Sequence, residues 1–448
     1  MEAYQLTATQ VLARLKDGSL TVEDYARSLL SRIEQRDATV KAWAYLDPEY
    51  VMSQAKALDQ TPREQRGPLH GVAVAVKDVI YTKDMPTQFN SPIYEGHAPS
   101  VDAASIAILR KAGALLLGAL LSRKTTTTEF AATTVGPKTG NPHDPTRTPG
   151  GSSSGSGAAV GDFQATLGLG TQTGGSTIRP GSFNGIYAFK PTWNSISREG
   201  QKIYALLFDT LGLYARSVDD LELLADVFAL HDDTAPPEAP FRVRGAKFAL
   251  LKTMVWPEVG TGTAAAMDKA AALLRAHGAE VEEIQLPAEF DDMPHYHRVV
   301  LHAEGRVAFL PEHRTAADRL HGFLVGHVEN EHKYTRAEQL RAWDSMAALR
   351  PKMDAIAAGY AAIITPSVPD EAPKGLESTG SASFCSIWTG LHTPTVNVPG
   401  FKGENGLPIG LTLVAPRYHD RHLLVVSKAV GEIFEAEGGW DRNSSLGV

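Results

Sequence analysis

Residues 71–78 read Gly-Val-Ala-Val-Ala-Val-Lys-Asp, a short apolar run with a glycine before it and two charged residues after it. Valine is β-branched and favours the pleated backbone of a strand. A run that is apolar at every position, without alternation, is typical of a strand buried on both faces. The stretch therefore predicts a strand over residues 72–76 inside a sheet, with Lys77 at its carboxyl end.

A helix and a second strand follow this first strand. Residues 103–111 carry apolar side chains at helical spacing and stop before Gly113, and residues 114–117 form another apolar run. A strand, a helix and a strand in this order predict a right-handed crossover between parallel strands, and hence an α/β protein. Ligands of such sheets bind at the carboxyl ends of the strands, which places Lys77 at a candidate site.

The rest of the chain is predicted to be helical at its start and to return to the sheet at its end. The first ~60 residues have helical periodicity, with a capping box that begins at Thr21, and we expect them to pack outside the core. Residues 232–240 indicate a connector, and the stretch from there to residue 355 is mostly helical and charged. Further strands are predicted at residues 361–365, 395–398 and 409–414.

The composition excludes several classes of protein. The chain has 448 residues, 43% of them hydrophobic and 21% charged, which fits a globular protein and rules out a disordered or fibrous one. The net charge of −8 argues against nucleic acid as a partner, because affinity for phosphates depends on clustered Lys and Arg. The N-terminus has no basic segment followed by an apolar one, and no stretch approaches the ~20 apolar residues of a membrane span, so we expect a cytoplasmic protein that binds no membrane. The single cysteine, Cys385, excludes an internal disulfide, and we expect it to be a buried packing residue.

Two loops rich in glycine and serine lie between the predicted strands. Residues 150–157 read Gly-Gly-Ser-Ser-Ser-Gly-Ser-Gly, and residues 170–180 read Gly-Thr-Gln-Thr-Gly-Gly-Ser-Thr-Ile-Arg-Pro. A serine hydroxyl becomes a nucleophile when a base takes its proton, and a desolvated lysine can be that base. The glycines before Ser176 let successive N–H groups turn toward one point, as an oxyanion hole requires. The residues alone leave open a surface lysine at Lys77 and loop serines that bond only to the backbone of a turn.

Together these motifs resemble the amidase signature family. Residues 150–153, 170–176 and 190–192 match its Gly-Gly-Ser-Ser, Gly-Thr-x-x-Gly-Gly-Ser and Lys-Pro-Thr elements, with further matches at 68–71, 209–212, 215–217 and 406–410. The resemblance covers most of residues 65–225 and a block around residues 385–420. It implies an α/β fold with a large mixed, mostly parallel central sheet covered by helices on both faces. We expect one domain over residues 1–448, with a catalytic core at 65–225, a variable and mostly helical region at 240–355, and a part at 360–436 that returns to the sheet.

Carried over position by position, the resemblance implies a catalytic triad of Lys77 as the base, Ser152 as the bridging serine and Ser176 as the nucleophile. It also implies a cis peptide bond before Ser152. The oxyanion hole would be made by backbone N–H groups, those of Thr173, Gly174, Gly175 and Ser176. The implied reaction is hydrolysis of a small-molecule carboxamide through a covalent acyl-enzyme, with release of ammonia or an amine. The resemblance implies that this chemistry uses no metal and no organic cofactor.

Arg179 and Asn184 depart from the commonest pattern of the family. The arginine lies three residues after the predicted nucleophile rather than two, which resembles the malonamidase-like branch, and there it could bind a substrate carboxylate with two hydrogen bonds. A structural arginine paired with an internal acidic group is equally open. Asn184 stands where relatives often carry cysteine, and because it is outside the triad the implied mechanism is unchanged.

Other chemistries are weaker alternatives. Residues 151–155 satisfy the Gly-x-Ser-x-Gly elbow of α/β-hydrolases with Ser153 as the nucleophile, but a loop so rich in Ser and Gly matches through its composition alone. The glycine-rich loops lack the Gly-Lys-Ser/Thr ending of a phosphate-binding loop. A metal site could be proposed from His295, His297, His302 and Glu304, but their spacing fits no tight zinc motif.

The motifs do not exclude a subunit of a larger assembly. The amidase-type subunit that supplies ammonia to a transfer-RNA amidotransferase would carry the same triad. A non-catalytic binding protein is disfavoured, because all three triad positions hold competent residues. The partner that we expect is a small-molecule amide substrate, and assembly as a homodimer is left open.

Overall fold

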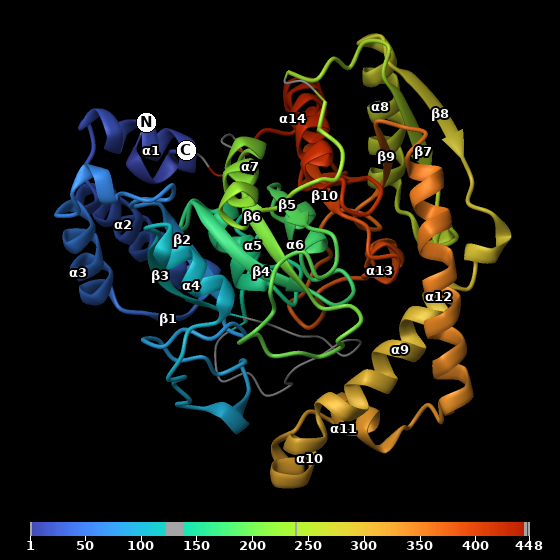
Figure 1. The fold of residues 1–448 in the computed structure, drawn as a ribbon, viewed down its shortest axis with the longest axis horizontal. Helices are drawn as coiled ribbons and strands as arrows, with labels where there is room; N and C mark the ends of the chain where they lie inside the picture. The colour runs from blue at the N-terminus through green and yellow to red at the C-terminus, as the bar shows by residue number, and fades with distance from the viewer. Residues whose placement is uncertain (1, 122–137, 238–239, 443–445, 447–448) are drawn as a thin grey trace.

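A computed structural model describes residues 2–121, 138–237, 240–442 and 446 of the chain (Figure 1). Its central element, among the described residues, is a sheet of eleven strands in the order β1-β3-β2-β4-β6-β5-β10-β11-β9-β7-β8. The strands are β1 Trp43–Leu46, β2 Ala73–Lys77, β3 Leu115–Leu120, β4 Leu167–Gln172, β5 Tyr187–Lys190, β6 Thr210–Ala215, β7 Lys247–Leu251, β8 Glu280–Ile284, β9 Ala362–Pro366, β10 Thr395–Lys402 and β11 Pro408–Val414. The predicted large mixed sheet is confirmed.

Parallel pairing is confined to two groups of strands. β2 lies parallel between β3 and β4, and β7 lies parallel between β8 and β9. The strands between these groups, β6, β5, β10 and β11, pair antiparallel with their neighbours, as does β1 at one edge. The parallel character predicted from residues 72–117 therefore holds for that part of the sheet and not for its middle.

Helices surround the sheet. Those of the described residues are α1 Ala8–Asp17, α2 Val22–Val40, α3 Pro48–Asp59, α4 Ala104–Lys111, α5 Ser154–Gly161, α6 Ile178–Phe183, α7 Val218–Val227, α8 Thr261–Ala276, α9 Met293–Ala308, α10 Leu310–Ala316, α11 Gly322–Glu329, α12 Arg336–Ala357, α13 Ser383–Gly390 and α14 Asp420–Glu437. In Figure 1, α1–α3 flank one end of the molecule, and α9–α12 extend along the opposite side. Within the described part of the chain, no helix combines the length and the apolar character needed to cross a bilayer.

Helices cover both faces of the sheet. Successive residues of a strand point to opposite faces. A side chain added at Gly181 of α6 would touch the Ala188 side chain of β5, whereas one added at Gly431 of α14 would touch the neighbouring Tyr187. Helix α6 therefore packs on one face of β5 and α14 packs on the other, as the resemblance implies.

The N-terminal helices are part of the core, and the expectation that they lie outside it is wrong. Thr21 caps α2, because its hydroxyl accepts a hydrogen bond from the Asp24 N–H at 3.0 Å, although the return bond from the Thr21 N–H that would complete the predicted capping box is not formed. Val11, Tyr25 and Leu29, however, are fully buried in the main hydrophobic cluster. Periodicity shows that a helix has an apolar face but not how deeply that face is covered.

The two glycine-rich loops meet at one edge of the sheet. Because β2 and β4 are adjacent and parallel, their last residues, Lys77 and Gln172, lie at the same edge. The loop after Gln172 leads into α6. The loop at residues 150–153 leads into α5, which packs over β2, β3 and β4. This edge is the carboxyl end that the sequence singles out for a ligand.

Candidate active site

Lys77 is buried at the end of β2 beside two hydroxyl groups. Its Nζ lies 2.7 Å from Ser152 Oγ and 2.7 Å from Thr171 Oγ1. Only 1% of its surface is exposed. The peptide bond between Gly151 and Ser152 is cis. The structure thus brings together the two residues predicted as base and bridging serine.

Burial lowers the pKa of the Lys77 amine from 10.5 to about 7. The loss of hydration is the largest cause, because it penalises the charged form. The Asp209 carboxylate opposes this lowering of the pKa, and the Arg179 guanidinium adds to it. The uncharged form of Lys77, which a lysine needs in order to accept a proton, is therefore accessible near neutral pH.

Residues 173–176 join β4 to α6, and each of their four carbonyl groups accepts a hydrogen bond from a different element. The contacts are His297 Nε2 to Thr173 O at 2.9 Å, Thr389 Oγ1 to Gly174 O at 2.6 Å, Arg179 N to Gly175 O at 3.0 Å, and the Tyr214 hydroxyl to Ser176 O at 3.2 Å. The donors belong to α9, α13, α6 and β6. Because each peptide unit is planar, holding the carbonyl also fixes the direction of the N–H group within the same unit.

The N–H groups of residues 173–176 have no hydrogen-bond partner in the part of the chain that the structure describes. The next two amides are occupied, because Oε1 of Gln172 accepts from the N–H groups of Thr177 at 2.9 Å and Ile178 at 3.0 Å. All four residues are buried, and buried N–H groups are nearly always paired. Four adjacent unpaired donors can therefore receive an oxyanion.

Gly175 lies against Cys385, and the contact leaves no room for a side chain. A Cβ at Gly175 would lie 3.0 Å from Cys385 Cβ and 3.1 Å from its Sγ. The buried position predicted for Cys385 is confirmed. Its thiol donates to the Ser367 carbonyl at 3.1 Å, and burial raises the pKa of the thiol to about 12. Such a thiol is not a nucleophile at neutral pH, and it supports the loop by packing.

Arg179 joins the two glycine-rich loops. Its guanidinium is buried and donates to the carbonyl of Gly151, at 2.5 Å from Nη2 and 3.2 Å from Nε, and to the carbonyl of Gly380 at 2.5 Å from Nη1. A Cβ at Gly150 would lie 3.0 Å from the Pro180 backbone, so the loops are in direct contact. The sequence left open that Arg179 pairs with an internal acidic group. In the structure its hydrogen-bond partners are backbone carbonyls instead.

The remaining serines and Asn184 take different positions. Ser176 is 3% exposed, and its hydroxyl has no hydrogen-bond partner among the described residues. Ser153 Oγ lies 3.2 Å from the backbone N and 3.3 Å from the backbone O of Thr171, so it fixes the first loop to β4. Asn184 donates to two backbone carbonyls at 2.7 Å. Of these groups, the Ser176 hydroxyl is the one left free to react.

The residues considered as metal ligands have other contacts. His297 donates to the loop at residues 173–176, and Glu304 accepts a hydrogen bond from a backbone N–H at 3.0 Å. Burial lowers the pKa of His297 and of His302 to about 4, so both imidazoles are neutral at pH 7. His295 packs near the ring of Tyr334. Within the described ranges, no group of three or more His, Cys, Asp or Glu side chains is arranged to hold a metal ion.

Several residues of the site carry no signal in the sequence. His297 lies 124 residues and Thr389 lies 215 residues from the carbonyls to which they donate. Thr171 and Gln172 stand within the second glycine-rich loop, but their roles depend on neighbours that only the fold supplies. The pairing of β2 with β4 could have pointed to Thr171, because residues at the ends of adjacent parallel strands are close.

A family model described as Amidase matches residues 24–424. The chain is 32% identical to the A component of the glutamyl-tRNA(Gln) amidotransferase of Symbiobacterium thermophilum, with 96% of each chain covered. It is 30% identical to the protein of that name from Streptomyces coelicolor, with 98% of each covered. The native peptide amidase from Stenotrophomonas maltophilia has a solved structure similar to this one, with a TM-score of 0.80, 26% identity, and coverage of 95% of this chain and 96% of that chain.

The mixed sheet and the buried lysine beside the glycine-rich loops define an amidase-type α/β protein. With the family model matched over most of its length, the chain belongs to the Amidase family and is an amidase-signature amide hydrolase. The resemblance seen in the sequence is confirmed.

Proposed function

We propose that the protein hydrolyses a carboxamide of a small molecule through Lys77, Ser152 and Ser176. The uncharged Lys77 amine takes the proton of Ser152, which takes the proton of Ser176 while the Ser176 oxygen attacks the amide carbonyl. The same groups return a proton to the leaving nitrogen, which departs as ammonia or an amine and leaves an acyl ester on Ser176. Water then attacks this ester, and its proton restores the Ser176 hydroxyl as the carboxylic acid is released.

The contact between Lys77 and Ser152, next to four unpaired N–H groups, is the observation that carries this proposal. Negative charge develops on the carbonyl oxygen during attack, and each fixed donor aimed at it is worth about 3 kcal/mol of transition-state stabilisation. The N–H groups of residues 174–176 are fixed before the reaction, because the carbonyls in the same peptide units, those of Thr173, Gly174 and Gly175, already accept hydrogen bonds from α9, α13 and α6. Little reorganisation is then needed when the charge appears.

Replacing the nucleophile tests the proposal, with a neighbouring serine as the matched control. We expect Ser176→Ala to lower ammonia release from a panel of primary carboxamides by about four orders of magnitude or more. A serine-directed phosphonate should label the wild type at Ser176 and fail to label this variant. Ser153→Ala should keep the label, because the hydroxyl of Ser153 is engaged with the Thr171 backbone. Full turnover by Ser176→Ala would refute the proposal.

We further propose Arg179 as a contact for a substrate carboxylate. A guanidinium has five N–H donors, and three of them are engaged with Gly151 and Gly380. The other two could bind a carboxylate held next to the scissile amide. Arg179→Lys keeps a positive charge but loses the planar fork. In this variant the KM of carboxylated amides should rise more than the KM of neutral amides. If both KM values rise equally, Arg179 does not bind the substrate carboxylate and serves only to hold the carbonyls of Gly151 and Gly380.

A second candidate is an ammonia-supplying subunit of a transfer-RNA amidotransferase. The curated relatives favour it over an enzyme that acts alone, because proteins with that name match at 30 to 32% identity over nearly the whole chain. The hydrolytic steps would be the same, in the cytoplasm, with the ammonia passed to a partner. Purification of the chain from its own cells should then bring partner subunits whose removal lowers ammonia release. Unchanged turnover by the isolated chain would favour the enzyme that acts alone.

A further inference from the structure

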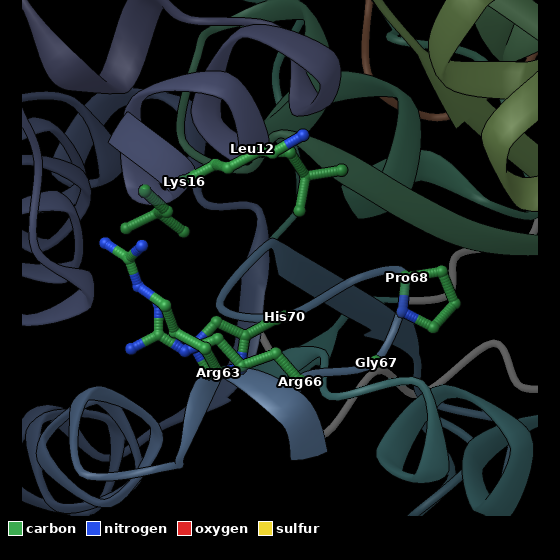
Figure 2. A pocket seen from close by; sticks show the side chains of 8 residues that line it. Leu12, Lys16, Arg63, Arg66, Gly67, Pro68 and His70 are labelled. Carbon is green, nitrogen blue, oxygen red and sulfur yellow. The ribbon is translucent and has the colours of Figure 1, made fainter. Parts of the chain in front are cut away.

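A hollow of about 440 Å³ lies at the opposite end of β2 from Lys77. It is formed between α1 and the segment that leads into β2, and Figure 2 shows the side chains that surround it. Its lining consists of Leu12, Leu15, Lys16, Arg63, Arg66, Gly67, Pro68 and His70. Strand β2 alone spans about 16 Å, since each residue of a strand rises ~3.3 Å. The hollow is therefore separate from the catalytic edge of the sheet.

Three cationic side chains line this hollow without a carboxylate partner. Lys16, Arg63 and Arg66 form no ion pair within 4.0 Å to any acidic group that the structure describes. Burial and the nearby Arg66 lower the pKa of His70 from 6.5, so this imidazole is neutral at pH 7. The hollow is thus lined by three positive side chains that form no ion pair, with the Asp59 carboxylate close enough to act on His70.

The segment that carries the cations is held in place by the core. Arg66 Nε donates to the Thr61 carbonyl at 3.1 Å, which leaves its terminal nitrogens available. Gly67 lies so close to the Ala112 carbonyl that a Cβ would approach its oxygen to 2.4 Å, and Leu69 N donates to the same carbonyl at 2.9 Å. The backbone that carries Arg66 is therefore fixed before a ligand binds, whereas the exposed side chains of Arg63 and Lys16 would be ordered by it.

One wall of the hollow is apolar. Leu15 is buried and Leu12 is half-buried on α1, and the ring of Pro68 also lines the hollow. An inorganic ion would leave this wall in contact with water. A ligand that combines an anionic group with a compact apolar part would cover both surfaces.

We propose that this hollow binds a phosphate monoester with a small apolar or aromatic group. The phosphoryl oxygens would accept hydrogen bonds from Arg63 and Arg66, whereas the Lys16 ammonium points away from these two guanidinium groups in Figure 2. The organic part would lie on Leu12, Leu15 and Pro68. A phosphate monoester is preferred to a monocarboxylate because its second pKa is about 6. At pH 7.5 it carries close to two negative charges, which match the two positive charges of Arg63 and Arg66.

Calorimetric titration of the full chain at pH 7.5 with phenyl phosphate, inorganic phosphate and benzoate tests the proposal. Phenyl phosphate should bind with saturation in the millimolar range or tighter. It should bind more tightly than inorganic phosphate, which lacks the apolar part, and more tightly than benzoate, which lacks the second charge. Absence of saturable binding up to about 10 mM, or tighter binding of benzoate, would overturn the proposal.

Substitutions assign the binding to this hollow. Arg66→Gln and Arg63→Gln should each weaken phenyl phosphate by about tenfold or more, the loss expected when a charge-assisted hydrogen bond is removed. Arg14→Gln removes an exposed arginine of the same helix as Lys16 that does not line the hollow, and it should change the affinity by less than about twofold. Equal weakening by Arg14→Gln would show a general effect of charge and overturn the site. Unchanged thermal unfolding midpoints of the variants would confirm that they fold.

Discussion

Replacing Lys77 by methionine should abolish amide hydrolysis and also change how the stability of the protein depends on pH. The pKa of Lys77 is 10.5 in the unfolded chain and about 7 in the fold. Between these two values the unfolded chain binds more protons than the folded chain, so stability rises with pH through this window. Below pH 7 both states are protonated, and the fold carries the full cost of a buried ammonium. Methionine has similar length and no charge, so the variant lacks this dependence.

The size of the effect follows from the lowered pKa. A shift from 10.5 to about 7 corresponds to about 5 kcal/mol in total, at ~1.4 kcal/mol for each unit. Of this amount, about 2 kcal/mol should be recovered by the wild type between pH 7 and pH 9. Urea unfolding of wild type and Lys77→Met at pH 7, 8 and 9 measures the difference directly. The other titrating groups, including the buried Lys190, are common to both proteins and cancel in the comparison.

An exposed lysine serves as the control. Lys56→Met on α3 should leave the pH dependence parallel to that of the wild type, because Lys56 is exposed. If Lys77→Met and wild type also run parallel from pH 7 to 9, the Lys77 amine is not desolvated in the native protein. The argument for an uncharged base near neutral pH would then fail, whatever the loss of activity.

Three further substitutions test single contacts. Thr171→Val removes an oxygen that accepts a hydrogen bond from the Lys77 ammonium, so the pKa of Lys77 should fall further. The lower midpoint of the pH–rate profile should then move down by about one pH unit. Thr171→Ser keeps the hydroxyl and should leave this midpoint unchanged. Gly175→Ala should displace the loop from Cys385 and lower kcat by about ten- to a hundredfold. Adding Cys385→Gly to this variant makes room for the new methyl group and should restore part of the lost kcat. If kcat does not recover, a clash with Cys385 is not the cause of the loss. Asp162→Ala leaves the buried Arg32 and the partly exposed Arg36 of α2 without their carboxylate and should cost about 3 kcal/mol of unfolding free energy in urea. A loss below ~1 kcal/mol would contradict the burial of the Arg32–Asp162 pair.

Much of the fold could be predicted because most of its strands are buried on both faces, with β1 and β8 as exceptions. Residues 72–76 lie within one residue of β2, and the strands expected at 361–365 and 409–414 are β9 and β11 with a shift of one residue. Apolar runs of this kind carry a strong signal for burial. They carry no signal for direction, which is why the antiparallel middle of the sheet could not be predicted. In the middle of the sheet, β10 and β11 are joined by residues 403–407 and β5 and β6 by residues 191–209, with no helix in either connection.

The chemistry near Lys77 could be predicted to a smaller extent. The glycine-rich loops stand out through residue types that few other functions need, and Lys77 and Ser152 are indeed in contact. The groups that hold the carbonyls of residues 173–176 could not be predicted. A histidine on a helix, such as His297, can equally well be solvated or packed in the core. Its hydrogen bond to the Thr173 carbonyl forms only because α9 packs beside the loop, and the sequence does not indicate this packing.

The position of His297 has a consequence for the way members of this family can change their substrates. The imidazole lies on α9, inside the region 240–355 that we expect to be variable, yet it donates to the carbonyl of Thr173, three residues before Ser176, the proposed nucleophile. Replacing this region with that of a relative would therefore change the support of the loop at residues 173–176 as well as the substrate selectivity. It would keep the rate only if the donated segment brought an equivalent N–H donor with it.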